Sequence, residues 1–155
     1  MEVTFTPEQE AEILQWITWL EETTLPQTKG ALKRKVEGVK DFAYCCLGIY
    51  AEHRHPECFS GYPTHEWGKF TFRLPEEQYE GEATTMVLPD PISEDVLGIG
   101  QRISETNHSL QMQLVNMNDS LEYSFKEIVI ELRHLLEHKC WTEETTSKLR
   151  YKGQH

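Results

Sequence analysis

Basic side chains gather in one stretch of this otherwise acidic chain, between residues 29 and 40. The stretch holds five of the fifteen lysine and arginine residues, namely Lys29, Lys33, Arg34, Lys35 and Lys40. Clustered ammonium and guanidinium groups hold phosphate by charge-assisted hydrogen bonds. The stretch is therefore a candidate anion-binding site. The alternative is a solvated edge strand that its lysines protect from pairing with other chains.

Aromatic and amide side chains elsewhere in the chain extend this candidate. Trp67, Phe70 and Phe72 carry rings that could stack on a nucleotide base, although such rings are more often used in core packing. Asn118 and Asp119 offer amide and carboxylate hydrogen bonds to a ligand. The alternative for this pair is a turn in which Asn and Asp bind their own backbone.

Four residues that lie close in the sequence are weak candidate metal ligands. They are His53, His55, Cys58 and His65, and Cys45 is a further candidate. Tetrahedral zinc sites favour tighter paired spacings, and the chain has no Cys-x-x-Cys motif. A solvated, histidine-rich loop is the alternative, and we expect no metal and no cofactor.

The adjacent Cys45 and Cys46 lie in an apolar run, where cysteine packs as a small hydrophobic residue. Thiols of low pKa need cationic or helix-start surroundings, which this run does not offer. We therefore expect both thiols to be buried and unreactive.

Motifs of known enzyme classes are missing from the sequence. It contains no Gly-x-Ser-x-Gly elbow, no His-Glu-x-x-His helix and no P-loop. The run Gly98-Ile99-Gly100-Gln101 lacks the third glycine of a dinucleotide fingerprint. The sequence therefore predicts a protein that binds rather than catalyses.

The net charge of -11 disfavours direct binding to duplex nucleic acid or to an anionic membrane surface. An acidic face that imitates nucleic acid is the sharper alternative to plain solubility. The first residues show no secretory signal, and the longest apolar run, from Phe42 to Ala51, is about half the length of a membrane span. We expect free thiols and a cytoplasmic protein.

Two capped, amphipathic segments frame the chain. In the first, Thr6 and Gln9 form a capping box, with Pro7 at the first helical position. Its core-facing residues recur at helical spacing and are Ile13, Trp16, Ile17 and Leu20. In the second, Ser124 and Glu127 form the box of another core helix.

Between these helices the pattern is mixed. Alternation at residues 32–35 suggests a short strand, and the run from Phe42 favours a helix that packs on the first one. Residues 69–74 and 85–88 are strand candidates. Residues 92–97, capped by Ser93, and residues 104–115 are expected to be helical.

The segments together predict an α+β, helix-rich domain, with N- and C-terminal amphipathic helices packed on a short central sheet or hairpin. The 155 residues suit one core, with residues 1–141 as the globular domain and 142–155 as a polar, loosely held tail, although Leu149 and Tyr151 could dock it.

Several of these motifs also occur in order across residues 16–136. They are Trp16 with Leu20, Gln27 and Gly30 with Leu32, Tyr44-Cys45-Cys46-Leu47-Gly48-Ile49, Leu88-Pro89, Val96-Leu97-Gly98, Leu114, Met117-Asn118-Asp119 and Ser124-Phe125-Lys126-Glu127-Ile128. The chain thereby resembles a family of small phage-encoded proteins with a Tyr-Cys-Cys-Leu-Gly-Val centre and a Leu-Asn-Asp…Ser-Phe-x-Glu-Ile ending. It departs from the pattern at residues 49–51, at Met117, and in a histidine-rich insert after Arg54.

The resemblance implies a phage accessory protein of the host cytoplasm, and it supplies no catalytic residues. Such proteins often disarm host defence. Our hypothesis is a non-enzymatic protein that counters a host system by binding either a small signalling nucleotide or a host protein, with oligomerisation left open. The alternatives are an acidic nucleic-acid mimic that binds a host DNA-binding protein, and a metal- or thiol-dependent enzyme.

Overall fold

Helix α1 (Pro7–Glu22) opens the fold in a computed structural model, which describes residues 2–103 and 108–152. The predicted capping box is confirmed. Gln9 donates its backbone N–H to Thr6 Oγ1 at 3.1 Å, and Thr6 donates its own to Gln9 Oε1 at 2.9 Å. The four predicted core residues of this helix are all buried. Because the box satisfies two end donors, the sequence alone placed the start of α1 correctly.

Helix α4 (Phe125–His138) is the second predicted core helix, and it packs along α1. Ser124 and Glu127 form its capping box with bonds of 3.2 and 3.0 Å. The helix ends at Lys139, whose φ of 61° places it in the left-handed region. A left-handed residue at this point stops a helix by turning its last carbonyls toward new donors.

The apolar run from Phe42 divides between a strand and a helix. β1 (Lys33–Arg34) pairs antiparallel with β2 (Ala43–Tyr44), in a register that matches Lys33 with Tyr44. Helix α2 (Cys46–Arg54) follows at once and packs on α1, as predicted. The predicted strand at residues 32–35 is confirmed in its two central residues.

Gly48 lets α2 approach the strand closely. A Cβ atom there would lie 1.7 Å from the carbonyl oxygen of Leu32, far inside van der Waals contact. On the other side of α2, the Trp16 indole donates a hydrogen bond of 2.9 Å to the Cys46 carbonyl. The helix is therefore fixed between α1 and the strand.

Residues 143–152 form a helix and not the loosely held tail that the sequence favoured; of the two residues that could dock the tail, Leu149 is buried and Tyr151 is exposed. Helix α5 (Glu143–Lys152) contacts α3 (Leu110–Asp119). Thr145 and Leu149, one turn apart, are buried, and Thr145 Oγ1 lies 2.6 Å from the Tyr123 hydroxyl. Two inward-facing residues in a polar decapeptide are too weak a periodic signal to be recognised from the sequence.

Helix α3 replaces the expected helix at residues 104–115. It begins later, at Leu110, with Ser109 as its cap, and the first four residues of the prediction lie outside the described part of the chain. Residues 91–96 form a π-helical segment, η2 (Pro91–Val96), so the prediction of a helical turn there is right. Ser93 is buried within it and is not its cap.

Neither strand candidate of the middle section forms a strand: residues 69–74 make isolated bridges, and residues 85–88 make none. Lys69 pairs with Arg34, and Phe72 pairs with both Phe59 and Thr84. Residues 85–88 contribute one backbone hydrogen bond of the kind found between strands, which the Leu32 amide donates to the Thr85 carbonyl at 2.7 Å. Prolines at 63, 75 and 89 bound these segments and keep the ladders short.

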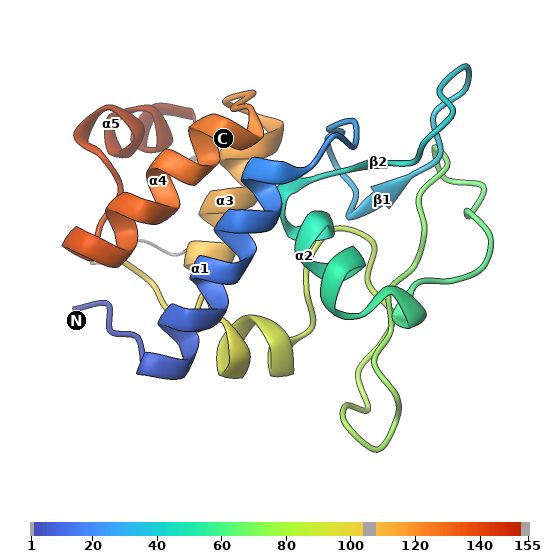
Figure 1. The fold of residues 1–155 in the computed structure, drawn as a ribbon, viewed down its shortest axis with the longest axis horizontal. Coiled ribbons are helices and arrows are strands. Elements are labelled where there is room, and N and C mark those ends of the chain that lie inside the picture. Colours follow the sequence, from blue (N-terminus) through green and yellow to red (C-terminus); the bar gives the residue numbers. More distant parts are fainter. Residues whose placement is uncertain (1, 104–107, 153–155) are drawn as a thin grey trace.

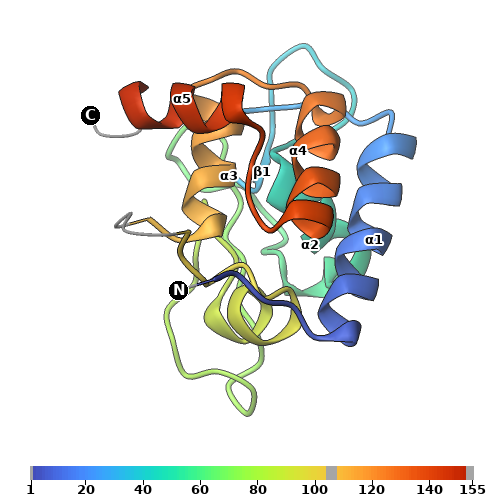
Figure 2. The same ribbon diagram turned by 90° about the vertical axis from the view of Figure 1, so that its left-hand side faces the viewer.

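The architecture is α+β, as predicted. The helices α1, α3, α4 and α5 occupy one end of the molecule, and the β1–β2 hairpin with residues 59–88 forms the other (Figure 1). Figure 2 looks onto the helical end, where α5 crosses beside α3 and α1 lies beside α4. Helix α2 lies between the two ends. Within the described ranges, no helix has the length and apolarity that a bilayer crossing requires.

Candidate functional site

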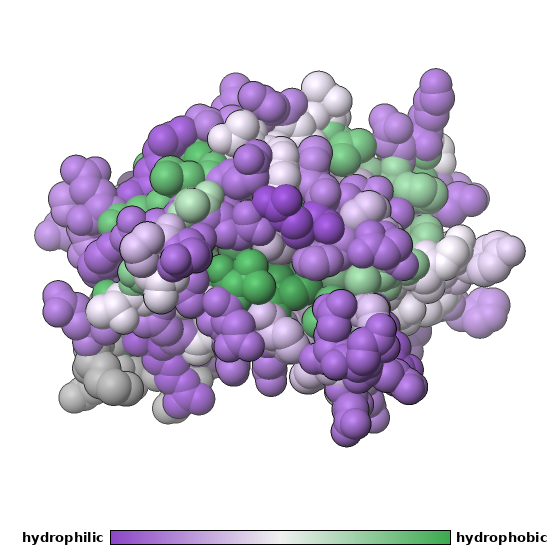
Figure 3. Space-filling view, turned by 60° about the horizontal axis from the view of Figure 1, so that its bottom comes forward, coloured by the Kyte–Doolittle hydropathy of each residue, from purple (hydrophilic) through white to green (hydrophobic). Residues whose placement is uncertain are grey.

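Turned so that the lower side of Figure 1 comes forward, the molecule presents mostly hydrophilic side chains around a small apolar area (Figure 3). A pocket of about 300 Å³ lies between the N-terminal segment and residues 94–101, lined in part by Gln9, Glu94 and Gln101.

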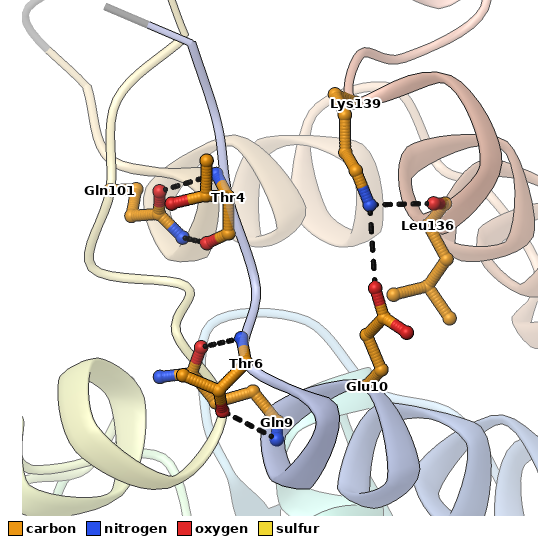
Figure 4. Close-up of polar contacts among 7 residues, drawn as sticks. All are labelled: Thr4, Thr6, Gln9, Glu10, Gln101, Leu136 and Lys139. Atoms are coloured by element: carbon orange, nitrogen blue, oxygen red, sulfur yellow. Dashed lines mark hydrogen bonds and ion pairs between the residues drawn. The ribbon is translucent and has the colours of Figure 1, made fainter.

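The polar groups around this pocket bind one another (Figure 4). Gln101 accepts from the Thr4 amide at 3.0 Å and donates to the Thr4 carbonyl at 2.6 Å. Nearby, the Lys139 ammonium donates to the Leu136 carbonyl at 2.9 Å and pairs with Glu10 at 3.5 Å. These contacts hold the N-terminal segment against the fold, so we assign the region a structural role.

Cys45 and Cys46 are buried, as the sequence predicted, but they lie at the start of α2, which corrects the expectation that this run offers no helix-start surroundings. Burial raises the pKa of the Cys45 thiol to about 12, and it raises the pKa of Cys46 well above its ordinary value. Both groups therefore stay protonated at neutral pH. A thiol in that state is a poor nucleophile, so the pair is unsuited to covalent chemistry.

Asn118 has a structural role, because its side chain joins three segments of the fold. This corrects its assignment as a ligand contact. Its side chain is 1% exposed. The amide oxygen accepts from the Cys46 backbone N–H at 3.2 Å and from Gln27 Nε2 at 2.8 Å. The amide nitrogen donates to the Thr28 carbonyl at 2.8 Å and to Asp119 at 2.9 Å. The side chain is fully used in joining α3, the start of α2 and the segment before β1.

The hydrogen bonds of Asn118 also explain part of the sequence pattern on which the family resemblance rests. Gln27, Cys46 and Asn118 come from three separate motifs and meet at this one point. Gly48 and Leu32, from two of the same motifs, form the close contact between α2 and the strand. These motif positions therefore hold the fold together.

Lys33 does not belong to the candidate anion-binding site either, because its ammonium group is buried. It is 9% exposed, and its ammonium lies over the rings of four aromatic residues. These are Phe42, Tyr44, Phe59 and Phe70, at 4.7 to 5.8 Å from the ring centroids. Its ammonium also lies 3.6 Å from Glu52 Oε2. Cation–π attraction and this ion pair offset the cost of burying the charge.

The remaining basic residues divide between internal contacts and solvent. Lys29 pairs with Glu122, and Arg34 donates to the Lys29 carbonyl at 2.7 Å and to the Trp67 carbonyl at 3.3 Å. Lys35 and Lys40 are exposed. The structure thus leaves the exposed lysines, and not the whole stretch, for binding a partner.

A loop packs beside these lysines and carries an exposed tryptophan. The backbone N–H of Lys35 donates to the Gly68 carbonyl at 2.9 Å, and that of Phe70 donates to the Lys33 carbonyl at 2.9 Å. Trp67 is 80% exposed. In contrast, Phe70 and Phe72 are buried, so of the three predicted stacking rings only Trp67 is accessible.

Trp67 occupies an unfavourable turn position. The Lys69 amide donates to the Glu66 carbonyl at 3.1 Å, and the two residues between them have φ angles of 58° and 72°. Two positive φ angles define a type I′ turn, whose central positions favour Asn, Asp and Gly. A bulky residue there is an outlier, and such strained residues cluster at functional sites. Gly68 suits the second position, and Trp67 does not suit the first.

We define the basic-aromatic lobe as residues 29–42 and 59–73, at the hairpin end of Figure 1. It holds seven of the fifteen basic residues of the chain and three of the twenty-six acidic ones. Tyr62, on the same loop as Trp67, is 84% exposed. Lys33 is buried, Arg34 binds backbone carbonyls, and Lys29 and Arg73 pair with Glu122 and Glu76, so the lobe offers a partner mainly Lys35, Lys40 and Lys69 beside two projecting aromatic side chains.

The candidate metal ligands are only partly brought together. His53 stacks on Trp19 with ring centroids 4.8 Å apart, and His65 is exposed in the loop before Trp67. His55 and Cys58 do meet, and Glu57, which the sequence reasoning missed, joins them. Glu57 lies between His55 and Cys58 in the sequence, and this position was the signal that could have identified it.

Comparisons of the whole chain with family profiles, with curated proteins and with solved structures find no significant match.

Proposed function

We propose that the protein is a non-enzymatic binding protein, which docks on an acidic surface of a partner protein through the basic-aromatic lobe. The observation that carries the proposal is Trp67, a large ring that is 80% exposed on a turn that does not favour it. Tryptophan and tyrosine are enriched among the few residues that supply most of the energy of a protein interface. Trp67 and Tyr62 are the anchors of this docking surface.

The charge of the lobe sets the chemistry of the partner. The lobe carries an excess of basic residues in a chain whose net charge is -11. A cationic patch steers an acidic surface into contact and discriminates against basic ones. The backbone hydrogen bond from Lys35 to Gly68 places Lys35 beside the Trp67 turn. The Lys35 charge and the Trp67 ring can therefore contact the same partner surface.

The shape of the lobe favours a protein over a small nucleotide. Pockets for small molecules are typically about 300 to 1,000 Å³ and bury most of the ligand. The lobe presents its rings on projecting loops, and the pocket of about 300 Å³ lies elsewhere and includes Glu94. An acidic side chain repels a phosphate, so neither place suits a nucleotide as well as the lobe suits an acidic protein.

The family resemblance supports the biological setting of the proposal. It points to a phage accessory protein of the host cytoplasm that counters a host defence by binding a host protein. The acidic nucleic-acid mimic is the competing reading. It requires a basic partner and gives the lobe no part in binding.

Affinity capture from host extract at low salt tests the proposal. Wild type, Trp67→Ala and Lys35→Glu are compared with two exposed controls away from the lobe, Tyr151→Ala and Lys126→Glu. The captured protein is identified, purified and titrated. We expect Trp67→Ala to weaken binding by about 2 kcal/mol, roughly 30-fold. We expect Lys35→Glu to slow association, and both controls to bind as wild type.

Two results would contradict the proposal. One is a partner that binds both lobe variants as tightly as wild type, and a basic, DNA-binding partner of this kind would support the mimic. The other is depletion of a defence nucleotide that heat releases intact, which would assign the protein to nucleotide sequestration.

A further inference from the structure

Three side chains at the end of α2 place different donor atoms close together. His55 Nδ1, Glu57 Oε1 and Cys58 Sγ lie within 4.8 Å of one another. The His55 nitrogen is 4.0 Å from the Glu57 oxygen, and the Cys58 sulfur is 3.9 Å from it. The sequence thus supplies an imidazole, a carboxylate and a thiol within four consecutive residues.

These separations are close to those around a bound zinc ion. With metal–ligand bonds of about 2.0 to 2.3 Å, tetrahedral geometry puts neighbouring ligand atoms roughly 3.3 to 3.8 Å apart. The two separations from Glu57, 4.0 and 3.9 Å, exceed this range by about 0.1 to 0.2 Å, and the third, between His55 and Cys58, is at most 4.8 Å, about 1 Å beyond it. The Glu57 side chain is 71% exposed, so a small rotation can bring its oxygen into range of both partners, whereas the gap between His55 and Cys58 closes by rotation of the Cys58 thiol or the His55 ring.

The backbone that carries the three donors is held in place. Residues 56–58 form a 3₁₀ turn, η1 (Pro56–Cys58), in which the Cys58 N–H donates to the His55 carbonyl at 3.0 Å. The Cys58 carbonyl in turn accepts from the Arg73 N–H at 2.9 Å. The His55 ring packs against Tyr50 and Phe72. Two of the donors are therefore positioned before any ion arrives, which lowers the entropic cost of binding.

The local charges are compatible with a cation. Arg54 is the nearest positive group in the sequence, and both oxygens of Glu12 bind its guanidinium at 2.6 and 2.9 Å. Burial lowers the pKa of His55, so its imidazole is neutral at pH 7, which is the form that binds metals. Burial and the Glu57 charge raise the pKa of the Cys58 thiol, so an ion must displace its proton.

We propose that His55, Glu57 and Cys58 form a three-ligand site for zinc or a similar borderline-soft divalent cation. Imidazole and thiolate ligands select such ions over magnesium and calcium. Three protein ligands leave one tetrahedral position open to water or to a group from a partner. Binding releases the Cys58 proton to solvent as the Sγ–metal bond forms. The site borders the basic-aromatic lobe at Phe72 and Arg73, but the proposal does not depend on docking through that lobe.

Titration of the reduced, metal-free full chain with Co²⁺ tests the site, because a thiolate bound to Co²⁺ gives a charge-transfer band in the near ultraviolet. We expect one equivalent to bind, with Zn²⁺ displacing the Co²⁺ and removing the band. Cys58→Ala abolishes the band. Glu57→Gln, at an exposed side chain that cannot upset the fold, weakens Co²⁺ binding by about 10-fold or more.

Matched controls separate this site from other donors of the chain. Cys140→Ala removes another partly buried thiol, and His65→Gln removes an exposed imidazole. Both should retain the band and the affinity of wild type. The proposal is overturned if wild type gives no band, if the band survives in Cys58→Ala, or if Glu57→Gln binds Co²⁺ as wild type does.

Discussion

Replacing Trp67 with asparagine separates the stability of the turn from the binding of a partner. A residue with a Cβ in the left-handed region costs roughly 1 to 2 kcal/mol, and asparagine tolerates that region best among non-glycine residues. The ring is only one-fifth buried, its exposed fraction being 80%. At about 25 cal/mol per Å², contact over roughly 50 Å² contributes about 1 kcal/mol at most.

The two contributions oppose each other, so we expect Trp67→Asn to change the free energy of unfolding by between 0 and about +1 kcal/mol. Trp67→Ala loses the same contact without relief of the strained φ angle, so it should be less stable than Trp67→Asn by about 1 kcal/mol. Both variants lose the anchor ring and should bind the partner equally weakly.

Urea unfolding followed by far-ultraviolet circular dichroism measures these changes, because the signal does not depend on the tryptophan removed. Trp16 is fully buried and serves as the comparison. Trp16→Ala should lower the free energy of unfolding by about 3 to 5 kcal/mol. The reasoning is refuted if Trp67→Asn destabilises the protein by more than about 1 kcal/mol, or if the Asn and Ala variants are equally stable.

Further substitutions test the interior. Asn118→Ala should lower the free energy of unfolding in urea by about 3 to 5 kcal/mol, since it removes four hydrogen bonds and leaves buried partners unpaired. Gly48→Ala should give little folded protein on expression, because its Cβ would lie 1.7 Å from the Leu32 carbonyl oxygen. In native protein, iodoacetamide should spare the buried Cys45 and Cys46 and modify the other two cysteines, as peptide mass spectrometry can show. Rapid alkylation of either buried thiol would contradict its raised pKa.

The elements with local signals were predictable from the sequence. The capping boxes at Thr6 and Ser124 fix two backbone donors each, so the starts of both core helices were placed to the residue. The burial of Cys46 followed from the apolar run around it. Helix α5 was missed because its stability depends on docking Thr145 and Leu149, which is a tertiary effect.

The candidate site was predictable only in part. The sequence showed the basic stretch, but it did not show that Lys33 turns inward among four aromatic rings while Lys35 points to solvent. Strand alternation would put both side chains on one face, but β1 ends at Arg34, so Lys35 lies beyond the strand and turns to solvent. The exposure of Trp67 likewise depends on a bridge between residues 34 and 69, which are distant in the sequence.

Photo-crosslinking in living cells that produce the protein tests the central claim most directly, because it reports what touches position 67. A photoreactive phenylalanine analogue replaces Trp67, and in separate proteins it replaces Tyr151 on α5 or Leu14 on α1, which are 73% and 50% exposed. We predict one discrete protein adduct from position 67, lost when Lys35→Glu is added, and none from the two control positions. No adduct at position 67, or the same adducts at all three positions, would contradict the assignment of the lobe as the docking surface.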